Sequence, residues 1–304
     1  MKPAEKTEQK FKLKHLPALL KKSAISWNSD DPWRLSAIVA YYAILSLPGL
    51  LVIIVNVVGY FWSTEIVEGV IYDELEAAMG TSAADGVQTI LESAGEEGQS
   101  LVSTIISIGA MIFGATGVFY HLQLSINKVW GIQSDPKSEI LRYLLDRVRS
   151  FGFVLVVAFL LLTSFVVSAL LSALHNYIGI WFPELSMYLL QVLNLIIPFA
   201  VVTLLFALIF KYLPDAYIRW KTVWIGAIIT SFLFTAGKEL LSFYFSEASP
   251  GSIYGAAGSL IIVMLWVTYS CLILLFGAEF SWVYSRWYGH GIRPKSYARS
   301  VISP

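Results

Sequence analysis

Three charged residues lie inside or beside the longest apolar runs of the chain, where a charge is costly. Lys238 and Glu239 fall near the end of the apolar run Val223–Tyr244. Glu279 falls near the end of the next run, Ser259–Tyr284. A charged side chain in hydrocarbon costs at least ~2.5–3.5 kcal/mol, so each of these residues needs a partner, water or a function. They are the first candidates for substrate binding or transport.

Helical geometry predicts which of these charges can meet. Neighbouring residues on a helix point about 100° apart, so Lys238 and Glu239 are not expected to face each other. The two runs are antiparallel, which puts Lys238 toward the outer membrane face and Glu279 toward the inner face. Two structural interpretations stay open: Lys238 snorkels to the outer interface, and Glu279 forms an ion pair at the inner surface. Three basic residues are its expected partners there: Lys211, Arg219 and Lys221.

Two stretches interrupt the apolar pattern and are further binding candidates. Gly255 and Gly258 lie in the flexible sequence SPGSIYGAAGS before the last run. Amides at the start of the following helix favour anions, and broken helices of this kind occur at transporter sites. Tight packing of a glycine-rich turn explains the sequence equally well. In the first apolar run, Pro48 predicts a kink that frees the carbonyl group of Ile44 beside Ser46.

No motif for catalysis is present. The sequence contains no phosphate-binding glycine loop, nucleophile elbow or zinc-protease helix. Its four histidines are scattered without metal-ligand spacing, and its single cysteine, Cys271, cannot form an intrachain disulfide. The sequence therefore predicts a protein that is not an enzyme and needs no metal or other cofactor. A membrane-bound hydrolase or nuclease is the least favoured alternative.

The composition is that of a membrane protein. Of 304 residues, 57% are hydrophobic and 14% are charged, with a mean hydropathy of +0.67. Soluble domains carry about 25% charged residues. Runs of about 20 apolar residues span a bilayer as helices, because backbone groups cannot stay unpaired in lipid. The predicted fold class is an all-α integral membrane protein with six transmembrane helices, at about residues 35–62, 101–122, 151–173, 187–210, 223–244 and 259–284.

The basic residues sort cleanly around these spans. Of 21 Lys and Arg residues, eight precede the first span, five lie between spans two and three, three between four and five, and four at or after the end of the sixth. The remaining one is Lys238, within the fifth span. The loops 63–100, 174–186 and 245–258 have none. Because cytoplasmic loops are enriched in basic residues, both termini are predicted to be cytoplasmic.

This pattern defines three parts of the chain. Residues 1–33 form a basic N-terminal segment, which either lies along an anionic membrane surface or is a solvated tail. The first apolar run begins near Leu35 and is too long for a signal peptide. Residues 34–285 form the membrane domain, and residues 286–304 form a cytoplasmic tail. Within the domain, the outer insert 63–100 carries nine acidic residues. Its apolar spacing predicts one or two amphipathic helices, the first around Ile66–Leu75 and a second, short one around Val87–Leu91.

Several stretches resemble the YihY/BrkB family of bacterial inner-membrane proteins, over roughly residues 25–290. They are KYLPDAYIRWKTVWIGAIITSFLF, GKELLSFYF, YGAAGSLIIVMLWVTYSCLILLFGAEFSWVY, AYYAILSLPGL and LQLSINKVWGI. The resemblance implies a six-span protein of the bacterial cytoplasmic membrane. The family once carried the label ribonuclease BN, for which this sequence offers no nuclease site. Its members are associated with virulence, serum resistance and the envelope, and some are linked to export of lipid or lipopolysaccharide precursors.

The resemblance also marks individual positions. The residues that match the family motifs are Tyr41, Tyr42, Ser46, Pro48, Asn127, Lys211, Pro214, Asp215, Lys238, Tyr254, Gly255, Gly258 and Glu279. Together with the charge argument, this makes the candidates for substrate binding or transport Lys238, Glu239, Glu279, Ser46, Pro48, Tyr42, Asn127, Tyr254, Gly255 and Gly258.

The leading hypothesis is a transporter or flippase for an amphipathic, anionic lipid or envelope precursor in the bacterial inner membrane. The alternative is a non-transporting scaffold that recruits partners through the acidic insert and the basic N-terminal segment. The expected partners are membrane lipids and envelope proteins. Nucleic acid is not expected, because the basic residues form a topology signal and not a continuous stripe with interleaved aromatic residues.

Overall fold

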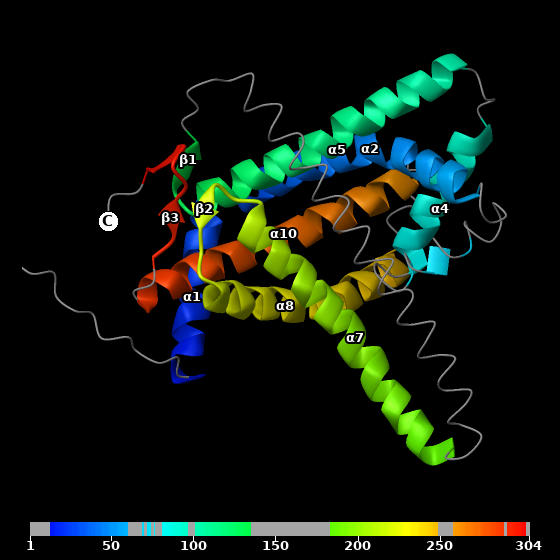
Figure 1. Ribbon diagram of the computed structural model, residues 1–304. Helices are drawn as coiled ribbons and strands as arrows, with labels where there is room; N and C mark the ends of the chain where they lie inside the picture. Colours follow the sequence, from blue (N-terminus) through cyan, green and yellow to red (C-terminus); the bar gives the residue numbers. More distant parts are fainter. Residues whose placement is uncertain are drawn as a thin grey trace, which may run out of the picture. The chain divides into compact units, whose positions relative to one another are not determined.

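Long apolar runs pair their backbone groups internally, and the chain accordingly folds mostly into helices. The structure, a computed structural model, describes residues 13–59, 69, 72–73, 76, 81–96, 101–134, 183–248, 258–288 and 291–301. The helices in these ranges are η1 (Leu13–His15), α1 (Leu16–Ser29), α2 (Pro32–Gly59), α4 (Thr81–Glu96), α5 (Leu101–Val129), α7 (Pro183–Tyr212), α8 (Trp220–Ala248) and α10 (Gly258–Trp287) (Figure 1).

Two of these helices are long and apolar enough to cross a membrane, over Trp220–Phe245 and Leu260–Trp287. They cover the fifth and sixth predicted spans. Helices α2, α5 and α7 overlap the first, second and fourth, whereas the third, residues 151–173, lies outside the described residues. The total of six spans stays a prediction. Helix α2 continues through Pro48, and α7 continues through Pro198.

The chain forms two compact units, which are described separately. The first unit contains residues 1–23, 127–232 and 277–304, and the second contains residues 24–126 and 233–276. Residues 220–232 of α8 and 277–287 of α10 belong to the first unit, and the remaining residues of both helices belong to the second. The predicted site residues are therefore divided, with Glu279 and Asn127 in the first unit and Lys238 and Ser46 in the second.

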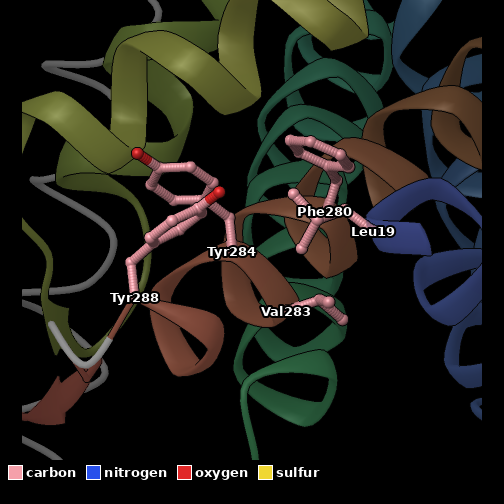
Figure 2. Packing of buried hydrophobic residues seen from close by; sticks show 5 residues of the cluster. All are labelled: Leu19, Phe280, Val283, Tyr284 and Tyr288. Atoms are coloured by element: carbon pink, nitrogen blue, oxygen red, sulfur yellow. The ribbon is translucent and has the colours of Figure 1, made fainter. Parts of the chain in front are cut away.

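The core of the first unit lies around the end of α10. Phe280, Val283, Tyr284 and Tyr288 project from this helix and its last turn, and Leu19 of α1 packs against them (Figure 2). Leu19 and Phe280 have no exposed surface. Burying side chains of this size contributes about 1.5–3 kcal/mol each. The beginning of α1 is thus an integral part of this core.

Polar contacts also fasten the N-terminal segment. A hydrogen bond of 2.9 Å joins His15 Nδ1 and Tyr288 Oη. The Lys22 ammonium lies 4.3 Å from the centre of the Trp287 ring, close enough for a cation–π interaction. The sequence left open a surface helix or a solvated tail for this segment. His15, Leu19 and Lys22 of this segment contact the end of α10 and Tyr288 just after it, and the position of the segment along a membrane surface stays a prediction.

Short strands bring the C-terminal tail against two loops. Strand β1 (Ile132–Ser134) pairs antiparallel with β4 (Ala298–Ser300), and β2 (Ala216–Tyr217) pairs antiparallel with β3 (Arg293–Pro294). Gly131 lets the chain turn from α5 into β1 because its φ of 62° suits glycine. The described residues are thus mostly helical, as predicted, with four short strands that the sequence analysis did not include, and these strands hold the described part of the tail in place.

In the second unit, α2 and α5 lie side by side with very little space between them (Figure 1). A Cβ atom on Gly114 would lie 2.6 Å from the backbone nitrogen of Ser46. Helix α4 covers the predicted insert helix around Val87–Leu91. Its Val87 forms a buried cluster with Phe245 of α8 and Val263 of α10. The predicted insert helix around Ile66–Leu75 lies largely outside the described residues.

Candidate functional site

Helices α8 and α10 interlock through two reciprocal glycine–hydroxyl contacts in the first unit. Gly226 faces Ser281, whose Oγ would lie 1.9 Å from an added Cβ atom. Gly277 faces Thr230, whose Oγ1 would lie 1.7 Å from an added Cβ atom. Each hydroxyl donates back to the glycine carbonyl of its own helix, Thr230 to Gly226 at 2.7 Å and Ser281 to Gly277 at 2.9 Å. The helices therefore approach closely while every one of these hydroxyl donors stays paired.

Glu279 lies between these two contact positions in sequence and has no exposed surface. At 100° per residue, its side chain leaves α10 on the face opposite Gly277 and Ser281. The indole nitrogen of Trp130 donates to the carbonyl oxygen of Ala278 at 2.9 Å, so the segment after α5 covers α10 at this level. A carboxyl group in such a place must be neutralised by a proton or by its surroundings. This is the most deeply buried of the predicted charged candidates.

Lys211 is one of the partners that the sequence offers for Glu279. Its ammonium donates to the carbonyl oxygen of Ile218 at 2.7 Å and lies 5.3 Å from the centre of the Trp220 ring. Both contacts hold the turn between α7 and α8. The described contacts of Lys211 therefore give it a structural role at the end of α7.

Asn127 binds the buried carboxyl group of Asp215. Its side-chain amide donates to Asp215 Oδ2 at 2.9 Å and accepts from the Asp215 backbone N–H at 2.9 Å. Ser134 Oγ donates to the same Oδ2 at 2.5 Å. The backbone N–H of Lys295 donates to the Asp215 carbonyl oxygen at 2.9 Å. These contacts join the end of α5, the turn before α8 and the C-terminal tail, so the geometry gives Asn127 a positioning role.

Lys238 and Glu239 form an ion pair in the second unit, with Nζ and Oε1 3.6 Å apart. The expectation that these neighbours would not face each other is wrong. Adjacent residues on a helix point about 100° apart, but the Lys238 and Glu239 side chains are long enough for their charged ends to meet. The side chain of Glu239 is 72% exposed and that of Lys238 25% exposed, so the pair is open to its surroundings and contributes little stability.

Tyr42 and Ser46 both lie on the face of α2 that packs against α5. Tyr42 stacks on His121 with ring centres 4.7 Å apart, and it covers Gly117, where a Cβ atom would lie 2.1 Å from its ring. The Ser46 hydroxyl donates to the carbonyl oxygen of Ala43 at 2.9 Å.

The remaining candidates are only partly described. Tyr254 and Gly255 lie outside the described residues, and the side-chain surroundings of Pro48 do as well. Gly258 is buried and begins α10. Across the described ranges, no group of three or more His, Cys, Asp or Glu residues is placed to hold a metal ion.

Sequence reasoning missed the four residues of the interlock and an open groove beside Arg34 and His121. The interlock has a readable signal, because Gly226-x3-Thr230 and Gly277-x3-Ser281 both place two small residues one helical turn apart. For the groove, the family motifs marked Tyr41 and Tyr42 individually, but their position beside His121 could not be predicted, because α2 and α5 residues remote in sequence meet there.

The similarity to known proteins extends over most of the chain. A profile of the family described as virulence factor BrkB matches residues 25–300. A UPF0761 membrane protein of Psychromonas ingrahamii is 27% identical over 242 residues, covering 79% of this chain and 78% of that protein. Another of Tolumonas auensis is 27% identical over 186 residues, covering 61% and 59%. One of Pseudomonas aeruginosa is 29% identical over 200 residues, covering 65% and 46%. No solved structure matches.

The family resemblance seen in the sequence is thereby confirmed. The relatives are named as membrane proteins, and their names describe no reaction. A match over residues 25–300 includes both helices of membrane-spanning length and most of the tail that follows them in the sequence. The chain belongs to the BrkB virulence factor family and is a membrane protein of that family.

Proposed function

We propose that this chain is an inner-membrane transporter or flippase for an amphipathic lipid or envelope precursor, with both termini in the cytoplasm. The observation that carries the proposal is the carboxyl group of Glu279, which has no exposed surface in a helix of membrane-spanning length. Ionisable residues inside membrane helices typically mark ion or substrate pathways, because an idle charge there would be too costly. No nucleotide-binding motif accompanies it, so an ion gradient is the expected source of energy.

In this proposal, Glu279 is the proton-coupling group. A buried carboxyl group exchanges its proton with water only when the helices around it move. Proton transfer and the opening of a lipid path would therefore occur in the same conformational step. The α8–α10 interlock near Glu279 is suited to such movement, because its hydroxyl groups bond within their own helices and not across the interface. At these two contacts the helices can shift without leaving an unpaired donor, whereas the hydrogen bond from Tyr269 Oη of α10 to the Leu233 carbonyl oxygen of α8, at 3.2 Å, would have to break.

Lys238 is not the preferred test residue for this function. It pairs with Glu239, and that pair is partly exposed. The anionic character of the cargo, which the sequence suggested from the stretch before α10, rests on residues outside the described ranges. The proposal therefore specifies an amphipathic molecule and assigns it no charge.

The proposal is tested in proteoliposomes that carry a fluorescent phospholipid and an imposed pH gradient. Wild-type protein should move the lipid faster than empty vesicles and respond to the gradient. Glu279→Gln, which keeps the shape of the side chain, should lower the gradient-driven rate by about two orders of magnitude, the usual loss when a proton-transfer group is removed. Glu247→Gln is the matched control, because Glu247 is an exposed residue of α8 that is not a candidate for binding or transport, and it should transport normally.

The results separate the possible functions. Equal rates for wild-type protein and Glu279→Gln would exclude Glu279 as the coupling group. A wild-type rate equal to that of empty vesicles would exclude transport and leave the scaffold hypothesis. Size-exclusion chromatography and the thermal midpoint report whether Glu279→Gln is folded, and Glu279→Asp, which retains an ionisable group, should recover part of the rate.

A further inference from the structure

An open groove in the second unit lies between the beginning of α2 and the end of α5. It has a volume of about 430 Å³ and is lined by Arg34, Ala37, Ile38, Tyr41, Tyr42 and His121. Most of the lining residues are apolar or aromatic. Arg34 is the lining residue that carries a full positive charge. The ring of Tyr41 is 57% exposed, so the groove opens to the surroundings of the protein. A site of this composition suits a molecule with an apolar body and a charged head.

Beside the groove, the charge of Arg34 is paired with that of Asp31, which is not itself one of the lining residues. Arg34 Nε donates to Asp31 Oδ2 at 2.5 Å, and these side chains are 61% and 52% exposed. Asp30, the preceding residue, is half-buried and adds a second carboxylate on the same turn. A purely anionic headgroup would be attracted by Arg34 and repelled by Asp31. A headgroup that carries both signs would be attracted by both residues.

We propose that this groove binds the zwitterionic headgroup of an aminophospholipid, with the phosphate on Arg34 and the primary amine on Asp31. A guanidinium group recognises phosphate oxygens through its planar set of N–H donors. A primary ammonium group donates hydrogen bonds to a carboxylate and is attracted to aromatic faces such as those of Tyr41 and Tyr42. The choline headgroup has no N–H donor for Asp31, and the glycerol headgroup has no positive charge.

The apolar lining favours a lipid over a soluble phosphate ester. Ala37, Ile38 and the two tyrosine rings offer contact area to an acyl chain or glycerol backbone, which a free headgroup does not have. The role of the groove as an entry point for cargo rests on the proposed transport function. The headgroup that the groove binds specifies the class of lipid that is transported. Binding itself is measured without translocation, so failure of the flux assay and failure of lipid capture are different results.

Photo-crosslinking in nanodiscs tests the proposal. The nanodiscs contain equal amounts of dioleoyl phosphatidylethanolamine, phosphatidylglycerol and phosphatidylcholine. The full chain carries p-benzoylphenylalanine in place of Tyr41, and mass spectrometry identifies the captured lipids. The control carries the same photoreactive residue in place of Phe232, an aromatic position on α8 that is 64% exposed and lies outside the groove. Phosphatidylethanolamine should be enriched at position 41 roughly two- to five-fold, the range that exposed charge pairs allow, and not at position 232.

Two substitutions then separate the headgroup contacts. Arg34→Gln should return capture at position 41 to the bulk ratio. Asp31→Asn should shift capture toward phosphatidylglycerol, because it leaves the arginine charge less balanced. Asparagine suits this position, since the φ of Asp31 is 60° and asparagine tolerates the left-handed region. Unchanged capture at position 232 in both variants shows that they remain folded.

Three other outcomes would contradict the proposal. Enrichment of phosphatidylglycerol or phosphatidylcholine in the unsubstituted groove would overturn the zwitterionic amine assignment. The same ratio at positions 41 and 232 would show that the groove has no lipid preference. Competition by excess soluble glycerophosphoethanolamine would assign the site to a free phosphate ester and not to a lipid.

Discussion

Asn127 and Asp215 lie 88 residues apart and exchange two hydrogen bonds of 2.9 Å through the same asparagine side chain. Asp215 is 1% exposed, so its carboxyl group depends on such donors. Ser134 supplies a further donor, and the backbone of Lys295 binds the Asp215 carbonyl oxygen. This network fixes the first unit at the point where α5, the turn before α8 and the C-terminal tail meet.

Asn127→Ala should therefore destabilise the first unit without abolishing lipid contact. Hydrogen bonds to charged groups contribute about 1.5–3 kcal/mol, and a loss of this size is expected in the free energy of unfolding. Thermal or detergent-induced unfolding of the purified protein measures it. Ser29→Ala is the control, since its exposed hydroxyl bonds only to Ser26 of the same helix. Equal stabilities of the two variants would show that the network carries no such energy.

Close packing of α2 on α5 makes Gly114 sensitive to a single added methyl group. In Gly114→Ala the new Cβ atom would meet the backbone nitrogen and Cα atom of Ser46 at 2.6 and 2.7 Å. Backbone atoms cannot rotate away, so the helices must separate, at a cost of about 1–3 kcal/mol. Gly109→Ala on the same helix meets nothing within 4 Å and should stabilise the helix by up to about 1 kcal/mol. Unfolding curves that shift the same way for both variants would refute this packing.

Leu19→Ala should detach the beginning of α1 from α10. Leu19 has no exposed surface, and truncating a buried leucine to alanine costs about 2–5 kcal/mol. Hydrogen–deuterium exchange should become faster in residues 16–23 of α1. Ile25→Ala, at a position that is 63% exposed, should leave exchange unchanged. Slow exchange of α1 in Leu19→Ala would mean that the polar contacts of His15 and Lys22 suffice to hold it.

Tyr72 provides a pH-dependent contact outside the predicted spans. Its hydroxyl donates to Asp85 Oδ1 at 2.7 Å, and this hydrogen bond, with smaller effects of burial and nearby carboxylates, raises the pKa of Tyr72 from 10.0 to about 12. Because the folded pKa is higher than the unfolded one, the contact is fully present below pH 10 and is lost as the pH rises through about 12. Asp85→Asn should lower the pKa of Tyr72 toward its ordinary value. Ultraviolet difference titration against Tyr72→Phe measures this pKa, and an unchanged value in Asp85→Asn would exclude the contact as its cause.

Helix positions could be predicted from the sequence because lipid-compatible helices are specified by local composition. Runs of about 20 apolar residues have one stable form in hydrocarbon, so α8 and α10 could be located to within a few residues. The pairing of β1 with β4 could not be predicted, because strands of three residues show no periodicity and their partners lie far apart in the chain. The Lys238–Glu239 pair was misjudged for another reason. The helical backbone sets the direction of each Cα–Cβ bond, but the length of the Lys238 and Glu239 side chains decides which groups they can contact.

By itself, the sequence determined that this chain belongs in a membrane, that it is mostly helical, and which charged residues lie in its apolar runs. These properties depend on transfer free energies and spacings that are local in the chain. Only the tertiary structure decided that Glu279 is fully buried, that Asn127 supports Asp215, and that Arg34 and Tyr41 share a groove. Burial and contact depend on which remote segments pack together, and the linear order of residues does not specify this.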